Sequence, residues 1–162
     1  MSEIIKVGIA DIKVVSPPDI IRTTGLGSCV GVILYDEGKK IAGMAHVMLP
    51  ESSLIKSPSM NIGKFADTAV NALYDMLIKK GAAAENIKAK IAGGAQMFQF
   101  SSGSEMMRIG PRNVESVKLH LNRVGVPLIA SDVGGNSGRT IEFNPANYQL
   151  TVKTVNKGTK TI

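Results

Sequence analysis

One cysteine and two histidines are the side chains of this 162-residue sequence from which a nucleophile and its base are most readily built. Cys29 follows the small-residue run Gly25-Leu26-Gly27-Ser28 and precedes an apolar segment, so it stands where a loop enters a strand. A lone cysteine is most often a small buried hydrophobe. Glycines beside it, however, let backbone N–H groups approach a substrate carbonyl closely, and loops at strand ends commonly carry site residues. This setting favours Cys29 as a nucleophile.

A predicted β-hairpin brings His46 beside Cys29. Residues 30–35 and 41–49 are typical of strands, and a turn signal lies between them at 36–39. If those four residues form the turn, Cys29 lies directly opposite His46, with Cβ atoms about 5 Å apart on one face of the sheet. A slip of one residue would reverse the faces, so the prediction depends on the length of the turn.

A thiol beside an imidazole can attack an amide. A free thiol titrates near about 8.5, so it needs a base that takes its proton at neutral pH. The thiolate then attacks the carbonyl carbon, and backbone N–H groups near Gly27 and Ser28 could stabilise the resulting oxyanion. The imidazolium protonates the departing ammonia or amine, and water hydrolyses the thioester. A third polar group usually orients the imidazole, and Thr23, Thr24 and Ser28 are all candidates.

Other sites that the sequence could form are less favoured. His120 falls inside a predicted helix and is expected to be a surface or half-buried residue. The run 25–28 lacks the Lys-Ser/Thr continuation of a phosphate-binding loop and leads into a strand. The glycine-rich run 134–139 is interpreted as a turn between strands rather than a binding site. A metal at Cys29 and His46 would need further ligands that the sequence does not place, so neither metal nor cofactor is expected.

The predicted elements favour an α+β fold, a layered α/β sandwich in one domain spanning residues 1–162. Apolar positions at helical spacing predict two main helices, at 60–80 and 111–123. Residues 22–29 are interpreted as a small-residue loop, and the last few residues are expected to be frayed. The remaining predicted strands are 4–15, 87–92, 127–131, 140–143 and 148–155. Strands joined by short turns indicate a largely antiparallel sheet.

Composition points to a soluble protein of the cytoplasm. Hydrophobic residues make up 44% and charged residues 20%, and the formal net charge is +6. No run of basic residues alternates with stacking aromatics, so nucleic acid is not expected as a partner and a solvated basic surface is the preferred interpretation. No apolar stretch approaches the roughly 20 residues that cross a membrane, and the N-terminus lacks the pattern of a signal peptide.

Several blocks of the sequence, in order, resemble the CheD family of chemoreceptor glutamine deamidases. The first two are TTGLGSCVG at 23–31 and GMAHVMLP at 43–50, which hold the cysteine and the histidine. The later blocks lie at 64–70, 90–98, 109–115 and 134–139. The resemblance spans nearly the whole chain, with no large insertion.

The resemblance implies hydrolysis of glutamine side-chain amides to glutamate in methyl-accepting chemotaxis receptors, without a cofactor. It assigns Cys29 as nucleophile, His46 as base and Thr23 as the third residue, on a layered sandwich similar to that of bacterial toxin deamidases. It also implies binding to the phosphatase CheC. Two alternatives stay open. One is a module that mainly binds CheC and catalyses little, and the other is a cysteine peptidase using the same chemistry on backbone amides.

Overall fold

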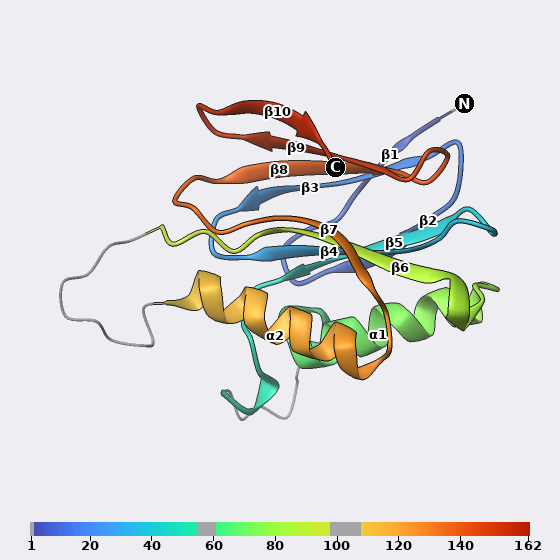
Figure 1. Ribbon diagram of the computed structural model, residues 1–162, viewed down its shortest axis with the longest axis horizontal. Coiled ribbons are helices and arrows are strands. Elements are labelled where there is room, and N and C mark those ends of the chain that lie inside the picture. Colours follow the sequence, from blue (N-terminus) through green and yellow to red (C-terminus); the bar gives the residue numbers. More distant parts are fainter. Residues whose placement is uncertain (1, 55–60, 98–107) are drawn as a thin grey trace.

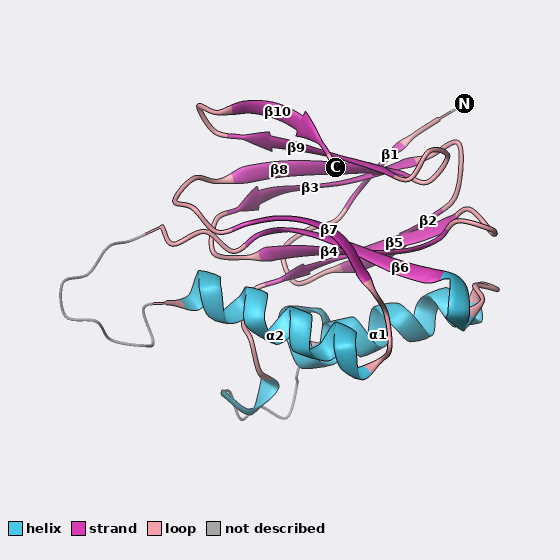
Figure 2. Ribbon diagram, viewed as in Figure 1, coloured by secondary structure: helices cyan, strands magenta, loops and turns pink. Residues whose placement is uncertain are grey.

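The protein is built in three layers, two β-sheets and a pair of helices (Figures 1 and 2). The computed structural model describes residues 2–54, 61–97 and 108–162. The outer sheet has the order β1 (Ile4–Lys6), β3 (Ile20–Leu26), β8 (Arg139–Asn144), β9 (Gln149–Thr154) and β10 (Gly158–Thr161). The central sheet has the order β2 (Ile12–Val15), β5 (Ile41–Val47), β4 (Val30–Asp36), β6 (Ile87–Gly93) and β7 (Leu128–Val133). Helices α1 (Ala66–Lys79) and α2 (Ile109–Arg123) cover the face of the central sheet that the outer sheet leaves free.

The layers follow from the hydrophobic pattern of each strand. All seven residues of β4 are buried, as expected for a strand packed on both faces. Val32 and its neighbours two residues away face the helices, whereas Ile33 and Tyr35 face the outer sheet. In β8, buried and partly buried residues alternate, so that only one face of the outer sheet packs on the core. Among the named strand pairs, β1/β3 and β6/β7 are parallel and the others are antiparallel, which confirms the predicted α+β layered fold.

The two helices lie close to their predicted positions. Helix α2 begins at Ile109 and ends at Arg123, two residues longer at its start than the pattern predicted. Helix α1 begins at Ala66 rather than at residue 60, which lies outside the described residues. Before Ala66 the chain forms a short 3-10 turn, in which Gly63 passes so close to the Ala10 carbonyl that a Cβ would lie 2.3 Å from its oxygen. That close passage, and the side-chain cap that Asn61 places on the Gly63 N–H, delay the α-helix.

The predicted hairpin register is wrong by two residues. Val30 pairs with Val47 and Gly31 pairs with His46, so Cys29 lies diagonal to His46 rather than opposite it. The turn spans 37–40 because Asp36 remains in the strand and closes the turn, accepting the Lys39 N–H on its side chain and the Lys40 N–H on its carbonyl. A shift of two residues preserves the alternation of faces, so Cys29 and His46 still point to the same side of the sheet.

Two segments predicted to be irregular are strands. Most of the expected loop at 22–29 belongs to β3, which pairs with β8 through Thr23 and Ile141, and only 27–29 lie between strands. The register shifts between Thr23 and Leu26, where Gly25 has a φ of 72°. The expectation of frayed last residues is also wrong. β10 pairs with β9, and Leu150 and Ile162 exchange backbone hydrogen bonds of 3.0 and 2.8 Å.

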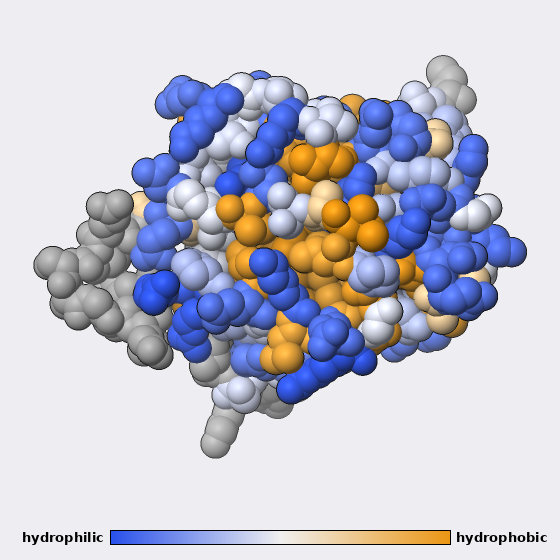
Figure 3. All heavy atoms as spheres, in the orientation of Figure 1, coloured by the Kyte–Doolittle hydropathy of each residue, from blue (hydrophilic) through white to orange (hydrophobic). Residues whose placement is uncertain are grey.

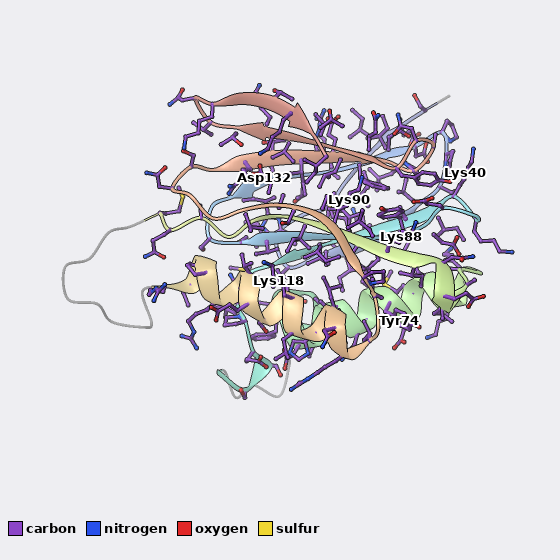
Figure 4. The ribbon with its side chains drawn as sticks, in the orientation of Figure 1. Lys40, Tyr74, Lys88, Lys90, Lys118 and Asp132 are labelled. Atoms are coloured by element: carbon purple, nitrogen blue, oxygen red, sulfur yellow. The ribbon has the colours of Figure 1, made fainter. Side chains whose placement is uncertain are left out.

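A buried lysine ties the last strands to the central sheet. Lys90 of β6, labelled in Figure 4, lies between the two sheets and is only 8% exposed. Its Nζ donates to the carbonyls of Tyr148, at 2.6 Å, and Ile162, at 2.9 Å, and lies over the ring of Tyr35. Burial lowers its pKa, and the charge of Glu37 opposes that effect.

An apolar area lies on the face seen in Figure 3, over β7 and the adjoining part of α2. β7 is an edge strand of the central sheet, and its Ile129 is 52% exposed. Leu119 of α2 is 42% exposed. None of the described helices is both long and apolar enough to cross a membrane.

Candidate active site

Three side chains singled out from the sequence point into the layer between the two sheets. His46 alternates along β5 with Ala45 and Val47, which face the helices, so His46 faces the outer sheet. Cys29 packs against the cluster between the sheets, and Thr23 lies two residues after Ile21 of that cluster on β3. Thr23 and His46 are 2% and 0% exposed, and Cys29 is partly exposed. The outer sheet therefore supplies the threonine, and the central sheet and its entry loop supply the histidine and cysteine.

A chain of hydrogen bonds fixes the tautomer of His46. The Thr23 hydroxyl lies 2.7 Å from the carbonyl oxygen of Val7 and 2.7 Å from Nδ1 of His46. Its one proton goes to the Val7 carbonyl, which can only accept, so Thr23 Oγ1 accepts the Nδ1–H of the imidazole. Nε2 is then left as the unprotonated nitrogen. It is buried and has no hydrogen-bond partner among the described residues, so its lone pair is available as a base.

The electrostatics of the site favour a neutral resting pair. Burial raises the pKa of the Cys29 thiol, and its own backbone N–H opposes the shift more weakly. Burial also lowers the pKa of the His46 imidazole below 6.5. Both shifts disfavour the charged forms, because a charge in a partly dry site loses its hydration. At neutral pH the site therefore rests as thiol and neutral imidazole.

The loop that carries Cys29 is held by its carbonyl groups. Gly27 O accepts the Ala95 N–H at 2.8 Å, and Cys29 O accepts the Gly94 N–H at 2.8 Å. Ser28 O accepts a side-chain N–H from α2 at 2.9 Å. Within the described part of the chain, the Ser28 N–H makes no hydrogen bond, and the Cys29 N–H interacts only with its own thiol. Three consecutive carbonyls thus turn away from the site, and among the described residues no other residue binds the two successive N–H groups, which is the arrangement that an oxyanion hole requires.

Glycine at 93 permits the close packing of this loop. Gly93 has a φ of 112°, and a Cβ there would lie 2.3 Å from the carbonyl oxygen of Cys29. From the outer sheet, Arg139 donates to the carbonyls of Gly93, at 3.2 Å, and Gly134, at 2.8 Å. The run 134–139 is a turn joining β7 to β8, as the sequence predicted, and it also braces the strand end behind the cysteine.

The other sequence candidates lie outside this arrangement. Thr24 is exposed, on the opposite face of β3 from Thr23, so it does not orient the imidazole. His120 is only 6% exposed, so the expectation of a surface or half-buried residue is wrong. It lies on α2, across the central sheet from His46, with its Nε2 3.4 Å from the carboxylate of Glu51. Because Glu51 and the neighbouring helix α1 cover it, His120 is buried without taking part in the site.

Two residues that support the site were not predicted from the sequence. Asn113 binds the loop from α2, and Arg139 binds the end of β6 from the outer sheet. A signal for Asn113 was present, since Asn113, Ser116 and His120 form a polar stripe at helical spacing beside the apolar stripe of α2, and all three are buried. No local pattern marks Arg139, whose partners come from another sheet. Within 2–54, 61–97 and 108–162, no three His, Cys, Asp or Glu side chains are grouped as a metal ion would require.

Comparisons with known proteins place this chain among chemotaxis proteins. Residues 48–154 match the family model CheD, described as CheD chemotactic sensory transduction. The chain is 56% identical to the chemoreceptor glutamine deamidase CheD of Halalkalibacterium halodurans, over 162 residues that cover 100% of both chains. It is 54% identical over 159 residues to the protein of the same name from Bacillus subtilis, covering 98% of this chain and 96% of that one. The probable chemoreceptor glutamine deamidase CheD of Lachnoclostridium phytofermentans is 56% identical over the full length of both chains.

Proposed function

This chain belongs to the CheD family, and from that premise and the geometry of its site we propose that it hydrolyses glutamine side-chain amides of chemoreceptors to glutamate. Cys29 is the nucleophile, His46 the base and Thr23 the residue that orients the base. The observation that carries the proposal is the hydrogen-bond chain from the Val7 carbonyl through Thr23 to His46, which leaves a buried Nε2 lone pair on the face that Cys29 shares.

Acylation begins from the neutral pair. As Sγ of Cys29 bonds to the amide carbon of the glutamine, its proton moves to Nε2 of His46. The carbonyl oxygen becomes an oxyanion held by the N–H groups of Ser28 and Cys29, where each donor can contribute about 10²–10³ in rate. The imidazolium gives its proton to the amide nitrogen, the carbon–nitrogen bond breaks and ammonia leaves. A thioester joins the substrate to Cys29.

Deacylation repeats the steps with water in place of the thiol. Nε2 of His46 takes a proton from water, and the resulting hydroxide attacks the thioester carbon. The oxyanion again rests on the same two N–H groups. The carbon–sulfur bond breaks, the sulfur recovers its proton from the imidazolium, and the product is glutamate. Thr23 keeps Nδ1 protonated throughout, so Nε2 is the nitrogen that exchanges protons.

Substitutions at the pair test this mechanism with a receptor cytoplasmic fragment as substrate. Cys29→Ala should abolish deamidation, and His46→Ala should lower it by about 10²–10⁴-fold, the range of positioned proton transfer. His120→Gln, on the far side of the central sheet, is the control and should deamidate normally. Mass spectrometry follows each glutamine. A fully active Cys29→Ala variant would refute the cysteine mechanism, and cleavage of the receptor chain would identify a peptidase instead.

We also propose CheC as a partner and the cytoplasm as the compartment, both on the strength of the family resemblance. A receptor segment held over Cys29 needs a protein-binding surface around the loop 27–29, and the economical arrangement is that CheC covers the same surface. CheC should then raise the apparent KM for receptor fragment without lowering kcat. By linkage, receptor fragment should weaken CheC binding by the same factor, which calorimetry measures. Simultaneous binding with unchanged affinities would refute the shared surface, and a CheC-binding chain without deamidase activity would favour the regulatory alternative.

A further inference from the structure

Asn113 reaches from α2 across to the loop that carries the cysteine. Its Nδ2 donates to the carbonyl oxygens of Ser28 and Met48, each at 2.9 Å. The side chain is fully buried, so water does not compete for these bonds. Ser28 and Met48 lie just beyond Val30 and Val47, the last paired residues of the β4–β5 hairpin. The carboxamide therefore bridges the two strands at the end where the nucleophile and the base lie.

Close packing of the helix start brings Asn113 within reach. Gly110 lies one turn before Asn113 on the same side of α2, and a Cβ at Gly110 would lie 2.2 Å from the carbonyl oxygen of Ala95. Ala95 in turn donates its N–H to Gly27 O. The first turn of the helix thus rests directly against the backbone that supports the loop, and the next turn presents the carboxamide to Ser28.

The hydrogen bond to Ser28 O determines where the Cys29 N–H points. The two groups belong to one planar trans peptide, so they point in opposite directions. Gly27 O accepts the Ala95 N–H, and this bond orients the Ser28 N–H, which belongs to the same peptide. Cys29 O accepts the Gly94 N–H. The peptide between Ser28 and Cys29 relies instead on the side chain of Asn113, its hydrogen-bond donor within the described residues.

The carboxamide can hold that peptide in one orientation only. Both nearby backbone atoms are carbonyl oxygens, so the NH₂ end must face them, and a flipped amide would place oxygen against oxygen. Oδ1 is buried without a hydrogen-bond partner in the described residues. A buried oxygen without a partner destabilises the fold, so the side chain is not optimised for stability alone. The bond to Met48 O anchors the group to the end of β5 and prevents it from rotating away.

We propose that Asn113 is a positioning residue, which holds the Ser28–Cys29 peptide so that the Cys29 N–H faces the oxyanion. The inference deepens the proposed function and rests on it. Two properties of the site, stabilisation of the oxyanion and reactivity of the thiol, then depend on different residues. Formation of the oxyanion needs the peptide orientation, whereas reactivity of the thiol depends on His46 and on Cys29 itself, which the Gly94 N–H holds independently of Asn113.

Two reactions of the full-length protein separate these properties. Deamidation of a receptor cytoplasmic fragment passes through an oxyanion, but alkylation of a thiol by iodoacetamide does not. Because Cys29 is the chain's one cysteine, alkylation reports on it alone. Asn113→Leu keeps the volume and removes both donors. It should lower kcat about 10²-fold, as expected for an oxyanion donor, with KM within about threefold. The rate and pH profile of alkylation should stay close to wild type.

The matched control is Asn71→Leu, the same change at an exposed asparagine of α1 whose side chain, among the described residues, donates to Asp67 O in its own helix. It should leave both reactions unchanged. If Asn113→Leu does not fold, Asn113→Asp serves in its place. It keeps the shape and sets a carboxylate against the two carbonyls, so it should also lose kcat and keep alkylation.

Each outcome decides the question. A wild-type kcat in a folded variant overturns the proposal, and so does a parallel fall of kcat and alkylation, which would indicate general loosening of the loop. Failure of both substitutions to fold assigns Asn113 to stability and overturns it as well. His46→Ala, measured alongside, tests the mechanism beneath the proposal. If it left deamidation and the alkylation profile unchanged, the proposed catalytic pair would fail, whatever the result at Asn113.

Discussion

Replacing Thr23 with valine removes one hydroxyl from the centre of the site and keeps the shape of the side chain. The hydroxyl serves two buried groups, the Val7 carbonyl and the Nδ1–H of His46, each at 2.7 Å. Thr23 is 2% exposed and His46 is 0% exposed, so water does not replace it. Each buried group left unsatisfied costs about 1–3 kcal/mol, so Thr23→Val should lower the free energy of unfolding by about 2 kcal/mol or more.

The effect on activity follows from the tautomer. In wild type, the bond to Thr23 keeps the proton on Nδ1 and the lone pair on Nε2. Without it, the tautomer preference loses the worth of one hydrogen bond, about 0.5–1.5 kcal/mol. Since 1.36 kcal/mol corresponds to a factor of ten in rate, kcat should fall by up to about tenfold. Thr23 is too deeply buried to touch substrate, so KM should change little.

Thr23→Ser is the matched control, because it keeps the oxygen and removes only the methyl group. Denaturant unfolding measures the stability of both variants, and steady-state deamidation of a receptor fragment measures kcat and KM. The serine variant should retain most of the activity that the valine variant loses. If valine and serine lowered kcat equally, or if valine lowered stability and left kcat untouched, Thr23 would be a structural residue only.

Two further predictions concern the pair and its support. Burial lowers the pKa of His46 and raises that of Cys29, so the base stays neutral and the thiol stays protonated over a wider pH range than in free side chains. The acid limb of kcat/KM should therefore lie below the pKa of a free histidine, about 6.5, and the alkaline limb above that of a free cysteine, about 8.5. An acid limb at or above about 6.5 would contradict the neutral pair. Gly93→Ala should lower both stability and kcat, because its φ is 112° and its Cβ would lie 2.3 Å from Cys29 O. Gly81 has a similar φ of 109°, but nothing lies within 4 Å of the Cβ that alanine would add there. Gly81→Ala should therefore lower stability and leave kcat unchanged. An equal loss of kcat in both variants would refute a catalytic effect of the Gly93 clash with Cys29 O.

The sequence was informative wherever a local pattern decides the structure. Helical spacing located α2 to within two residues, and the alternation along β4 and β5 placed Cys29 and His46 on one face. That result survived a register error of two residues because the period of a strand is two. An error of one residue would have separated the pair. The sequence therefore correctly predicted that Cys29 and His46 lie on one face of the sheet, but it wrongly predicted that they pair directly.

Long-range pairing decided what the local pattern did not. Thr23 looked like part of a loop because small residues and glycine surround it, yet β8, more than a hundred residues later, pairs with it. Arg139 braces the end of β6 from the other sheet, and no spacing in the sequence links it to Gly93. Asn113 was visible as a polar residue on a buried helix face, but its acceptors are backbone carbonyls, which a sequence does not mark.

Under the proposed mechanism, the neutral resting pair lets one partly exposed cysteine act as the nucleophile without being consumed by side reactions. Oxidants and alkylating agents attack the thiolate, and burial raises the pKa of Cys29 so that little thiolate exists between turnovers. The same burial keeps His46 neutral and ready to accept a proton. In that mechanism the charged pair forms chiefly as sulfur bonds to carbon, when the N–H groups of Ser28 and Cys29 gain an oxyanion to bind. Stabilisation confined to that moment raises kcat rather than substrate affinity, and the roles proposed for Thr23, His46 and Asn113 around a neutral thiol are all of this kind.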